Sequence, residues 1–431
     1  MTKARAEPRI FFGWWLVTAA FGIQILHSSL LFLSQGAYLV QLEAGFGWSR
    51  SSISGAFSML RLESGILGPL QGWMIDRYGP KLVMRIGATL FGLGFIALGQ
   101  IHSLWQFYGA LALIAIGSSL GGFLTIHTAI AHWFLRKRAR AMSVGSAGFA
   151  SGALLAPVVA WSMVEFGWRS TAVLSGIAIL AIGIPVAQAF RRSPEDYGLL
   201  PDGAQPMQPS GEQSPMDRAD VPTERHQVGE ESDFSVREAM RDRAFWFVAL
   251  GHGTALLVTS TVPVHFVPYL VDENGWSLTA TSLVFPAIMV MQITGQIGGG
   301  ILGDIYSKRA VASVAMFGHG GAFLVLAFSA SVPAVIVAIV LHGLAWGSRG
   351  PLMMAIRADY FGRRNLGQIA GWSNSITILG SVIGPLYAGI LFDVTGTYKL
   401  AFWTLGAATM LSTVFFMAAR KPPPPTRGVG S

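Results

Sequence analysis

The stretch Gly72–Lys81 reads "GWMIDRYGPK", and a related stretch, "GILGDIYSKR", occupies residues 300–309. Three residues of the first stretch have a counterpart of the same kind in the second: Gly72 and Gly300, Asp76 and Asp304, Lys81 and Arg309. The two residue numbers of each pair differ by 228, which we call the repeat offset. The same offset separates Trp48 from Trp276 and Pro157 from Pro385. Because several residue classes agree on one offset, the chain is interpreted as a tandem duplication.

The chain is far more apolar than a soluble protein of its length. Of its 431 residues 52% are hydrophobic and 12% are charged, and the mean hydropathy is +0.52. Ordinary soluble domains carry roughly 25% charged residues, so a lipid solvent is indicated. A membrane span needs about 20 apolar residues. Twelve segments meet this length: 11–40, 50–75, 82–101, 104–133, 141–164, 170–190, 245–271, 278–302, 311–330, 333–358, 367–391 and 398–419.

The spans predict an all-α integral membrane protein with two six-helix halves, residues 11–190 and 244–419. Since six spans separate the copies, the halves have parallel topology, and an axis along the membrane normal relates them. Residues 191–243 between them are rich in Pro, Gly, Ser and charge, which predicts a mostly disordered linker. "SVREAMRDRAFW" at its end (residues 235–246) predicts a short surface helix. Residues 1–10 and 420–431 are short tails.

The basic residues give the expected orientation. The termini, the linker and the loops that follow even-numbered spans hold 25 of the 30 Lys and Arg residues. The other side holds Arg50, Arg169 and Lys399. By the positive-inside rule, both termini and the linker are expected in the cytoplasm, with the protein in the inner (plasma) membrane. Basic charge spread over separate short loops also excludes a nucleic-acid partner, despite a pI near 9.9.

With these features the sequence resembles the major facilitator superfamily. That family carries, between spans two and three, a Gly, an Asp four residues later, then Arg-x-Gly and a basic residue. Gly72, Asp76, Arg77, Gly79 and Lys81 match this pattern. Asp304, Lys308 and Arg309 form the weaker second copy expected after span eight. The resemblance implies a twelve-helix carrier that works as a monomer, whose charged residues here form a conformational latch that is made in one state and broken in another.

A narrower likeness is to the monocarboxylate and oxalate–formate branch of that superfamily. "FFGWWLV" (residues 11–17), "FGWSRSSIS" (46–54) and "GPLQGWMIDRYGPK" (68–81) look like that branch's sequences in and around spans one and two. Members of that branch often place a substrate-binding Arg in span eight, whereas span eight here has no charge. An Arg appears instead in span two, at Arg61, and the position related to it by the repeat is Met289. An anion site with altered geometry is therefore expected.

Three charged residues are expected near the middle of the membrane: Arg61 and Glu63 in span two and Arg349 in span ten. A charge at this depth costs about 3 kcal/mol or more. Arg cannot be neutralised there, and its planar fork fits a carboxylate, so Arg61 and Arg349 are candidate substrate ligands. Residues i and i+2 point about 200° apart on a helix, so Arg61 and Glu63 make a poor pair. Glu63 either meets another helix or carries a proton.

The resemblance implies that spans one, four, seven and ten line the cavity, with spans two and eight beside it. Polar residues on these spans, together with Asn374 on span eleven, complete the candidate substrate site. They are Gln24, His27, His127 and Asn374, with His252, His342, Gln35 and Gln292 as further positions. A lone His in a helix usually packs as a neutral, hydrogen-bonded residue, and amides also join helices. Both interpretations stay open for these residues.

The pattern favours a secondary transporter for a small organic anion, a monocarboxylate in view of the resemblance, coupled to protons or working by exchange. An exporter of amphipathic or drug-like compounds is the alternative, although such exporters would more naturally hold an acidic residue. A membrane enzyme or receptor is disfavoured, because the chain has no nucleotide loop, no metal-spaced cluster and no Ser–His–Asp set. Without cysteines there is no thiolate site. No cofactor or metal is expected.

Overall fold

The computed structural model describes residues 11–48, 50–204, 233–281 and 283–425, and the described residues are helices and connecting turns. The N-terminal half contains α1 (Phe12–His27), α2 (Gln35–Phe46), α3 (Arg50–Tyr78), α4 (Pro80–Leu98), α5 (Leu104–Leu120), α6 (Phe123–Trp133), α7 (Arg138–Ser151), α8 (Ala156–Glu165) and α9 (Gly167–Val186). The C-terminal half contains α11 (Arg243–Pro268), α12 (Leu278–Thr281), α13 (Val284–Ile305), α14 (Lys308–Phe328), α15 (Val332–Phe361), α16 (Leu366–Thr395), α17 (Lys399–Leu411) and α18 (Thr413–Ala418).

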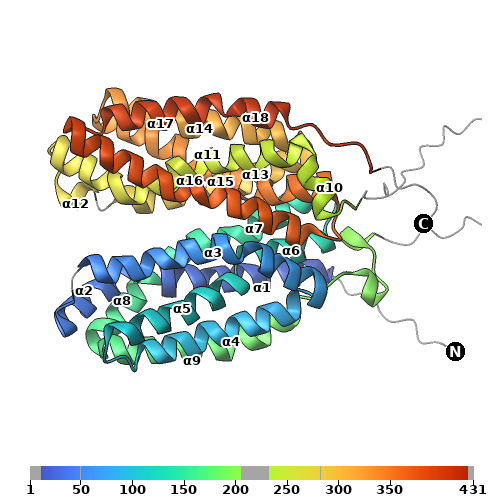
Figure 1. Cartoon of the computed structure of the whole chain (residues 1–431), viewed down its shortest axis with the longest axis horizontal. Helices are drawn as coiled ribbons and strands as arrows, with labels where there is room; N and C mark the ends of the chain where they lie inside the picture. The colour runs from blue at the N-terminus through green and yellow to red at the C-terminus, as the bar shows by residue number, and fades with distance from the viewer. Residues whose placement is uncertain (1–10, 49, 205–232, 282, 426–431) are drawn as a thin grey trace, which may run out of the picture.

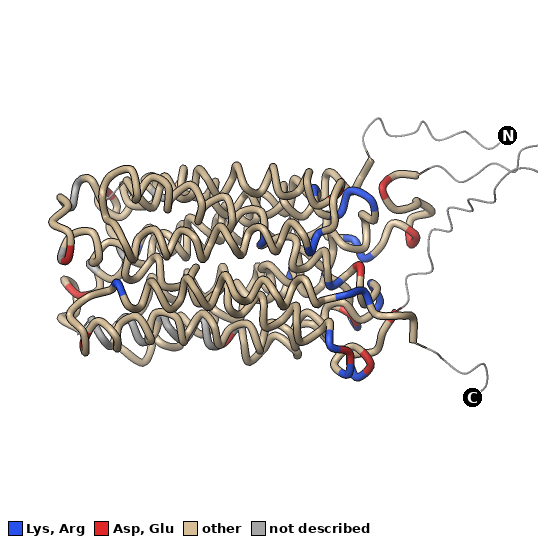
Figure 2. Tube along the Cα trace, turned by 90° about the horizontal axis from the view of Figure 1, so that it is seen from above, with Lys and Arg blue, Asp and Glu red and all other residues tan. Residues whose placement is uncertain are grey.

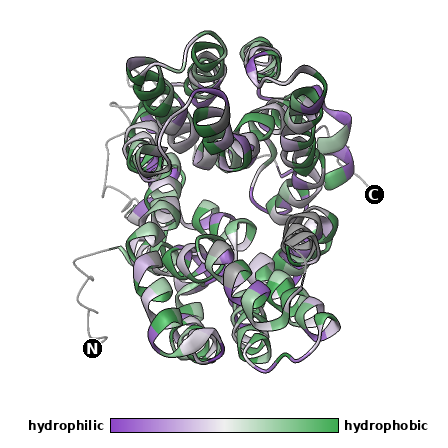
Figure 3. Cartoon of the chain, turned by 90° about the vertical axis from the view of Figure 1, so that its left-hand side faces the viewer, coloured by the Kyte–Doolittle hydropathy of each residue, from purple (hydrophilic) through white to green (hydrophobic). Residues whose placement is uncertain are grey.

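The helices form two elongated bundles that lie side by side, one from each half of the chain (Figure 1). Seen along the bundle axis, hydrophobic residues cover much of the outer rim of both bundles (Figure 3). Side chains such as Leu154, Val164 and Phe328 are about four-fifths exposed in the isolated chain. Exposed apolar surface on this scale is what a lipid environment requires. The twelve-helix membrane fold expected from the sequence is confirmed.

Eleven helical segments of the described chain are long and apolar enough to cross a membrane. Several of them join two helices, as in Phe12–Leu39, where α1 continues through a π-helical turn at Ser28–Phe32 into α2. The remaining span is α3, which has 29 residues but carries Arg61 and Glu63 in its interior. The charged residues that make this span hard to recognise by composition are therefore those that the sequence singles out for function.

Lys and Arg residues gather at one end of the bundle, where both described termini leave it (Figure 2). We call this end, which carries the loops at 77–81, 136–140, 308–309 and 363–364, the basic end. The separation of charge matches the asymmetry read from the sequence, and the opposite end holds few basic residues.

The two flanks of the linker, residues 191–204 and 233–243, form short helices and turns that pack on the bundles. Residues 191–204 pack on the N-terminal half, where the Trp133 indole donates to the Arg191 carbonyl at 3.1 Å. The expected short helix is α10 (Val236–Arg241), and Ser235 and Glu238 form a capping box at its start. Residues 205–232 lie outside the described part of the chain.

Glycines let the two halves approach closely along α3 and α16. A Cβ at Gly72 would overlap the carbonyl of Gly367, and a Cβ at Gly371 would overlap that of Gly68. Nearer the opposite end, the hydroxyl of Ser375 donates to the Gly65 carbonyl at 2.6 Å. These positions form a seam of backbone contact between the halves, because small residues allow helices to pack at short distance in a membrane.

Replacing Gly72 with Ala should therefore destabilise the protein. The added methyl meets a backbone carbonyl that cannot rotate away, and overpacking of this kind costs about 1–3 kcal/mol. Gly298→Ala on α13 is the matched control, since a Cβ there meets no atom within 4 Å. Thermal unfolding of the purified variants measures the difference. A Gly72→Ala midpoint equal to that of Gly298→Ala would contradict the close approach.

Candidate functional site

The aspartates of the two repeated stretches join the halves at the basic end. Asp76, in the last turn of α3, accepts hydrogen bonds from the backbone N–H groups of Gly367 at 2.9 Å and Gln368 at 2.8 Å. These are the second and third residues of α16, whose own N-cap residue, Asn365, makes no side-chain cap bond. Asp76 thus supplies from the other half the cap that a helix N-terminus normally takes from its own chain.

The second repeat makes the same contact in the opposite direction. Asp304, in the last turns of α13, accepts from the N–H groups of Ala139 at 3.0 Å and Arg140 at 3.3 Å, at the start of α7. The repeat offset relates Ala139 to Gly367 and Arg140 to Gln368. Each half therefore offers one carboxylate and one positive helix end to the other, a pairing that the helix dipole favours.

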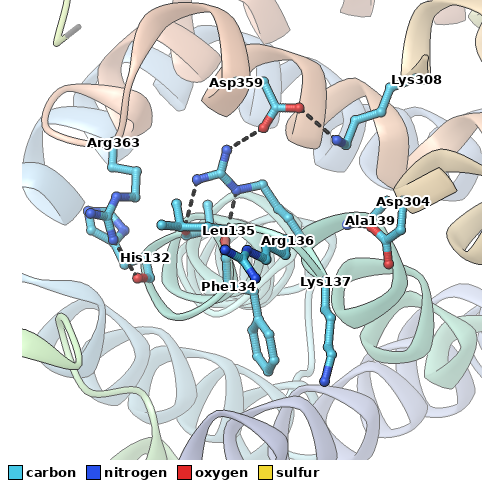
Figure 4. Close-up of polar contacts among 12 residues, drawn as sticks. His132, Phe134, Leu135, Arg136, Lys137, Ala139, Asp304, Lys308, Asp359 and Arg363 are labelled. Carbon is cyan, nitrogen blue, oxygen red and sulfur yellow. Dashed lines mark hydrogen bonds and ion pairs between the residues drawn. The ribbon is translucent and has the colours of Figure 1, made fainter. Parts of the chain in front are cut away.

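An ion-pair network lies beside these caps (Figure 4). Arg138, which is 1% exposed, pairs through Nη1 with Asp359 Oδ1 of the other half and donates to the carbonyls of Phe134 and Ala131. Lys308 Nζ lies 2.8 Å from the second oxygen of Asp359. Asp359 thus holds a cation from each half, so the network connects the start of α7 to the end of α15.

Arg363 makes a further polar contact between the halves. Its guanidinium donates to the His132 carbonyl at 2.7 Å (Figure 4). The same guanidinium lies 3.4 Å from the Glu195 carboxylate. Behind these contacts, apolar side chains of both halves form one buried cluster that includes Trp133, Phe134, Met142, Met354, Ala358 and Leu366. These polar contacts and the buried apolar cluster together close the basic end.

The ordered flanks of the linker cap the loops that lead into α7 and α16. Asp202 accepts from the N–H groups of Leu135 and Arg136 at 3.0 and 2.7 Å. Asp233 accepts from those of Arg363 and Arg364 at 3.1 and 3.0 Å, the positions that the repeat offset relates to Leu135 and Arg136. Each helix start is therefore held by one aspartate from the linker and one from the opposite half.

In the described part of the chain, the residues expected to form the latch do not lie together but in three separate places. Gly72 lies in the seam, Asp76 and Asp304 are the caps, and Lys308 belongs to the ion-pair network. Arg192, rather than the loop at 77–81, donates to the Asp76 carbonyl at 2.9 Å. Arg77, Lys81 and Arg309 make no ion pair with another described residue. The aspartates bind backbone amides, so each contact is a helix cap, and at Asp304 an ion pair with Arg140 Nε at 3.7 Å adds to it.

Among the described contacts, the hydrogen bonds between the halves run from the basic end to a level marked by Gly65 and Ser146. At that level Ser375 donates to the Gly65 carbonyl, and Gln296 Nε2 donates to the Ser146 carbonyl at 3.4 Å. Position 61 stands one helical turn beyond Gly65 and on the same face of α3, toward the opposite end. The side chain of Arg61 lies outside the described residues.

Glu63 is partly buried on α3. Neither of its carboxylate oxygens has a hydrogen-bond partner in the described part of the chain. A buried carboxylate without a partner is unfavourable when ionised. The sequence left open a structural pair between Glu63 and another helix. The described residues supply no hydrogen-bond partner for such a pair.

Arg349 and a second arginine, Arg357, are buried inside the C-terminal half. Arg349 is 1% exposed, and its Nε donates to His319 Nε2 on α14 at 3.5 Å. Arg357 donates to the Ser373 hydroxyl on α16, to the Met353 carbonyl and to His252. Neither guanidinium contacts a carboxylate of the described chain. The core of this half therefore holds two positive charges without a described anionic partner.

The remaining candidates are packed in the helices. His127 bonds through Nδ1 to the Phe123 carbonyl at 2.8 Å and through Nε2 to the Ser146 hydroxyl at 2.7 Å, so both ring nitrogens are engaged. His27 packs edge-on against Phe91 and lines a small apolar pocket. Gln24 is 5% exposed, and Asn374 accepts from the Thr377 hydroxyl. Among the hydrogen bonds described for the chain, none joins these four residues to Arg349.

Sequence reasoning missed Arg138, His319 and Arg357. Arg357 falls within the expected span 333–358. A charged residue inside an apolar run indicates a functional position, so the sequence could have pointed to it. His319 lies on the ninth span, which was not considered as a lining helix. Arg138 reads as one more basic loop residue, and only the approach of Asp359 from the other half distinguishes it.

Two parallel six-span halves that close on each other at one end are an architecture that membrane transporters use. The sequence profile of the Major Facilitator Superfamily matches residues 10–266 and 248–431. The chain belongs to this superfamily.

Several curated relatives are similar over most of their length. Monocarboxylate transporter 11 of Mus musculus is 26% identical over 96% of this chain and 89% of its own. The hexuronate transporter of Bacillus subtilis is 23% identical over 83% of both chains, and a probable sulfoacetate transporter of Cupriavidus necator is 24% identical over 87% and 86%.

Solved structures share the fold. The fucose transporter FucP in an outward conformation aligns with a TM-score of 0.71 at 16% identity, over 96% of this chain and 99% of its own. The human organic anion transporter MFSD10 aligns with a TM-score of 0.65 at 18% identity, over 94% and 97%.

Neutralising a cap should slow the cycle and spare binding. Asp76→Asn removes the charge that Gly367 and Gln368 stabilise, which costs about 0.5–2 kcal/mol for a cap and weakens the state closed at the basic end. Asp304→Asn should behave alike, because its contact is equivalent by the repeat. Asp393→Asn, on the exposed end of α16, is the control. Uptake rates in proteoliposomes and substrate affinity by calorimetry decide, and an equal loss of affinity and rate would contradict the cap role.

The Arg138–Asp359 pair should show coupling in a double-mutant cycle. Arg138→Gln leaves one carboxylate oxygen of Asp359 without its cation. Asp359→Asn leaves the buried Arg138 guanidinium without its negative partner. The double variant should therefore lose about 0.5–3 kcal/mol less than the sum of the single losses. The free energy of unfolding of the four proteins gives the coupling energy. Strictly additive losses would show that the pair contributes nothing.

Proposed function

We propose that the chain is a secondary active transporter that carries a small organic anion, a monocarboxylate in the first instance, across the inner (plasma) membrane. The basic end is taken as cytoplasmic, with both termini and the linker on that side, because short basic loops remain inside. In this assignment the structure is closed toward the cytoplasm. The partners are the anion, protons and the bilayer, and the working unit is taken as a monomer.

The observation that carries the proposal is the positive charge of Arg349 and Arg357 in the C-terminal half, for which the described part of the chain supplies no carboxylate partner. A buried ion that lacks a counter-charge is strongly disfavoured in a medium of low dielectric constant. Both arginines therefore raise the potential around α15 and favour a negative ligand there. The names of the relatives point the same way, since they concern monocarboxylates, a hexuronate and a sulfoacetate.

Arg61 is proposed as the contact that draws the halves together. Its position lies one helical turn beyond the last described hydrogen bond between α3 and α16. At this level a bound ligand would lie between the two halves. An anion that is held by Arg61 of one half and attracted by Arg349 of the other stabilises the state in which the two halves lie closer together. Such differential binding is what lets a substrate shift the equilibrium between two states. Gln24, His27, His127 and Asn374 are proposed to complete the site, and Glu63 to carry a coupled proton.

Uptake into proteoliposomes tests this proposal. The panel is lactate, pyruvate, formate, oxalate, glucuronate and sulfoacetate, with glucose and a lipophilic cation as controls. We expect accumulation of at least one anion, driven by an inward proton gradient or by the same anion inside. Transport of the lipophilic cation without any anion would overturn the proposal in favour of the exporter of amphipathic compounds.

Arg61→Lys should weaken anion binding at least tenfold, although it keeps the charge. Lysine cannot offer the two parallel N–H groups that a carboxylate accepts from a guanidinium. Arg169→Lys, at the opposite end of the bundle, is the control for the same chemical change. Calorimetric titration with the best anion of the panel measures affinity, and thermal unfolding checks the fold. Wild-type affinity in Arg61→Lys would end the claim that Arg61 is a ligand.

A further inference from the structure

Two histidines and one arginine form a buried polar row that the closed basic end does not use. His319 lies on α14, and His342 and Arg349 lie two turns apart on α15. The three residues are at most 2% exposed. Arg349 Nε lies 3.5 Å from His319 Nε2, and His319 Nδ1 lies 3.3 Å from His342 Nδ1.

The direction of each hydrogen bond follows from the chemistry of the donors. An arginine only donates, so His319 Nε2 must accept, and its one proton must sit on Nδ1. His319 Nδ1–H then donates to His342 Nδ1, which leaves the proton of His342 on Nε2. Arg349 therefore fixes the tautomer of both imidazoles and occupies the lone pair by which His319 would accept a proton.

The row ends on unpaired donors. His342 Nε2 and Arg349 Nη1 are both buried without a hydrogen-bond partner in the described part of the chain. The charged or titratable groups that act on the row are positive or neutral: Arg349 itself, with His252 of α11 near both Arg349 and Arg357. Among the described residues, α13, α17 and α18 bring no acidic side chain into contact with it. Protonation of either histidine thus depends on what Arg349 does.

We propose that Arg349, His319 and His342 form a proton switch in which movement of Arg349 frees the His319 Nε2 lone pair to take up one solvent proton from hydronium, which leaves a water molecule. The new N–H bond turns His319 into an imidazolium, and its Nδ1–H bond to His342 is kept. Return of Arg349 to His319 requires that the proton leave. Arg349 is thus a positioning residue for His319.

The switch would couple protons to the anion, a step that rests on the proposed function. A carboxylate that draws the Arg349 guanidinium toward itself removes the donor from His319 and adds the negative charge that an imidazolium needs. Anion and proton then bind together, and by linkage each raises the affinity for the other by the same factor. Glu63 lies in the other half, so its contribution is separable by substitution.

A difference titration tests the switch without any substrate. Arg349→Gln removes the charge and the Nε–H donor that hold His319. Purified Arg349→Gln protein should take up about one proton more than the wild type between pH 8 and 5. The extra proton should vanish when His319→Gln is added to Arg349→Gln, and should persist in the control comparison in which both the wild type and the Arg349→Gln protein carry His102→Gln, a change at an exposed residue. An extra proton that survives His319→Gln, or none at all in folded Arg349→Gln protein, would overturn the proposal.

Histidine ¹⁵N NMR spectra give an independent check. In the wild type, His319 should show the Nδ1–H tautomer and His342 the Nε2–H tautomer, with signals assigned from His319→Gln and His342→Gln proteins. Arg349→Gln should release His319 from the Nδ1–H tautomer. A wild-type His319 that carries its proton on Nε2 would contradict the assigned bond directions.

The coupling to transport is tested with lactate and pyruvate as probes. Calorimetry in buffers of different ionisation enthalpy should show, for each anion bound, about one proton more taken up by the wild type than by His319→Gln protein. The same difference should separate Glu63→Gln from Glu63→Gln with His319→Gln, because the proton of His319 does not depend on Glu63. Anion binding without proton uptake overturns the switch and leaves the proposed function intact. If no panel anion binds the wild type, the proposed function fails, and the difference titration still decides the switch.

Discussion

The closed end of this transporter depends on two carboxylates that cap helices of the opposite half. A helix N-terminus leaves its first amides without partners, and in a membrane protein water cannot freely satisfy them. Asp76 and Asp304 take that role across the interface, at α16 and α7. The two caps consist of four hydrogen bonds, few enough to be exchanged in one step of a transport cycle.

The rest of the basic end is arranged around these caps. Glycines at Gly68 and Gly72 bring α3 close enough to α16 for Asp76 to reach the amides. Asp202 and Asp233 fix the loops that precede α7 and α16, so the amides are already oriented when the opposite half arrives. The Arg138–Asp359–Lys308 network departs from the repeat, because the residue that the repeat offset relates to Arg138 is Leu366. Closure therefore has a symmetric part and an asymmetric part.

The positive charges inside the membrane pose a different physical problem from the charges at its surface. At the basic end, opposite charges meet across the described interface, as Arg138 and Lys308 do on Asp359. Around α15, the described hydrogen-bond partners of Arg349 and Arg357 are neutral groups, namely imidazoles, a hydroxyl and a carbonyl. Neutral dipoles stabilise a guanidinium without cancelling its charge, so an anion still gains by approaching. The same neutral partners make the protonation of His319 sensitive to the position of Arg349.

The sequence by itself determined the twelve spans, the duplication and the asymmetry of basic charge, because hydropathy and the repeat offset are properties of the linear chain. It also marked Asp76 and Asp304, since both copies retain them. Only the tertiary structure decided what they bind, because the backbone amides of Gly367 and Ala139 carry no signal in the sequence. For the same reason the links from Arg138 to Asp359 and from Arg349 to His319 appeared only in the fold. Each joins residues on different helices, and helix packing, not composition, sets which side chains meet.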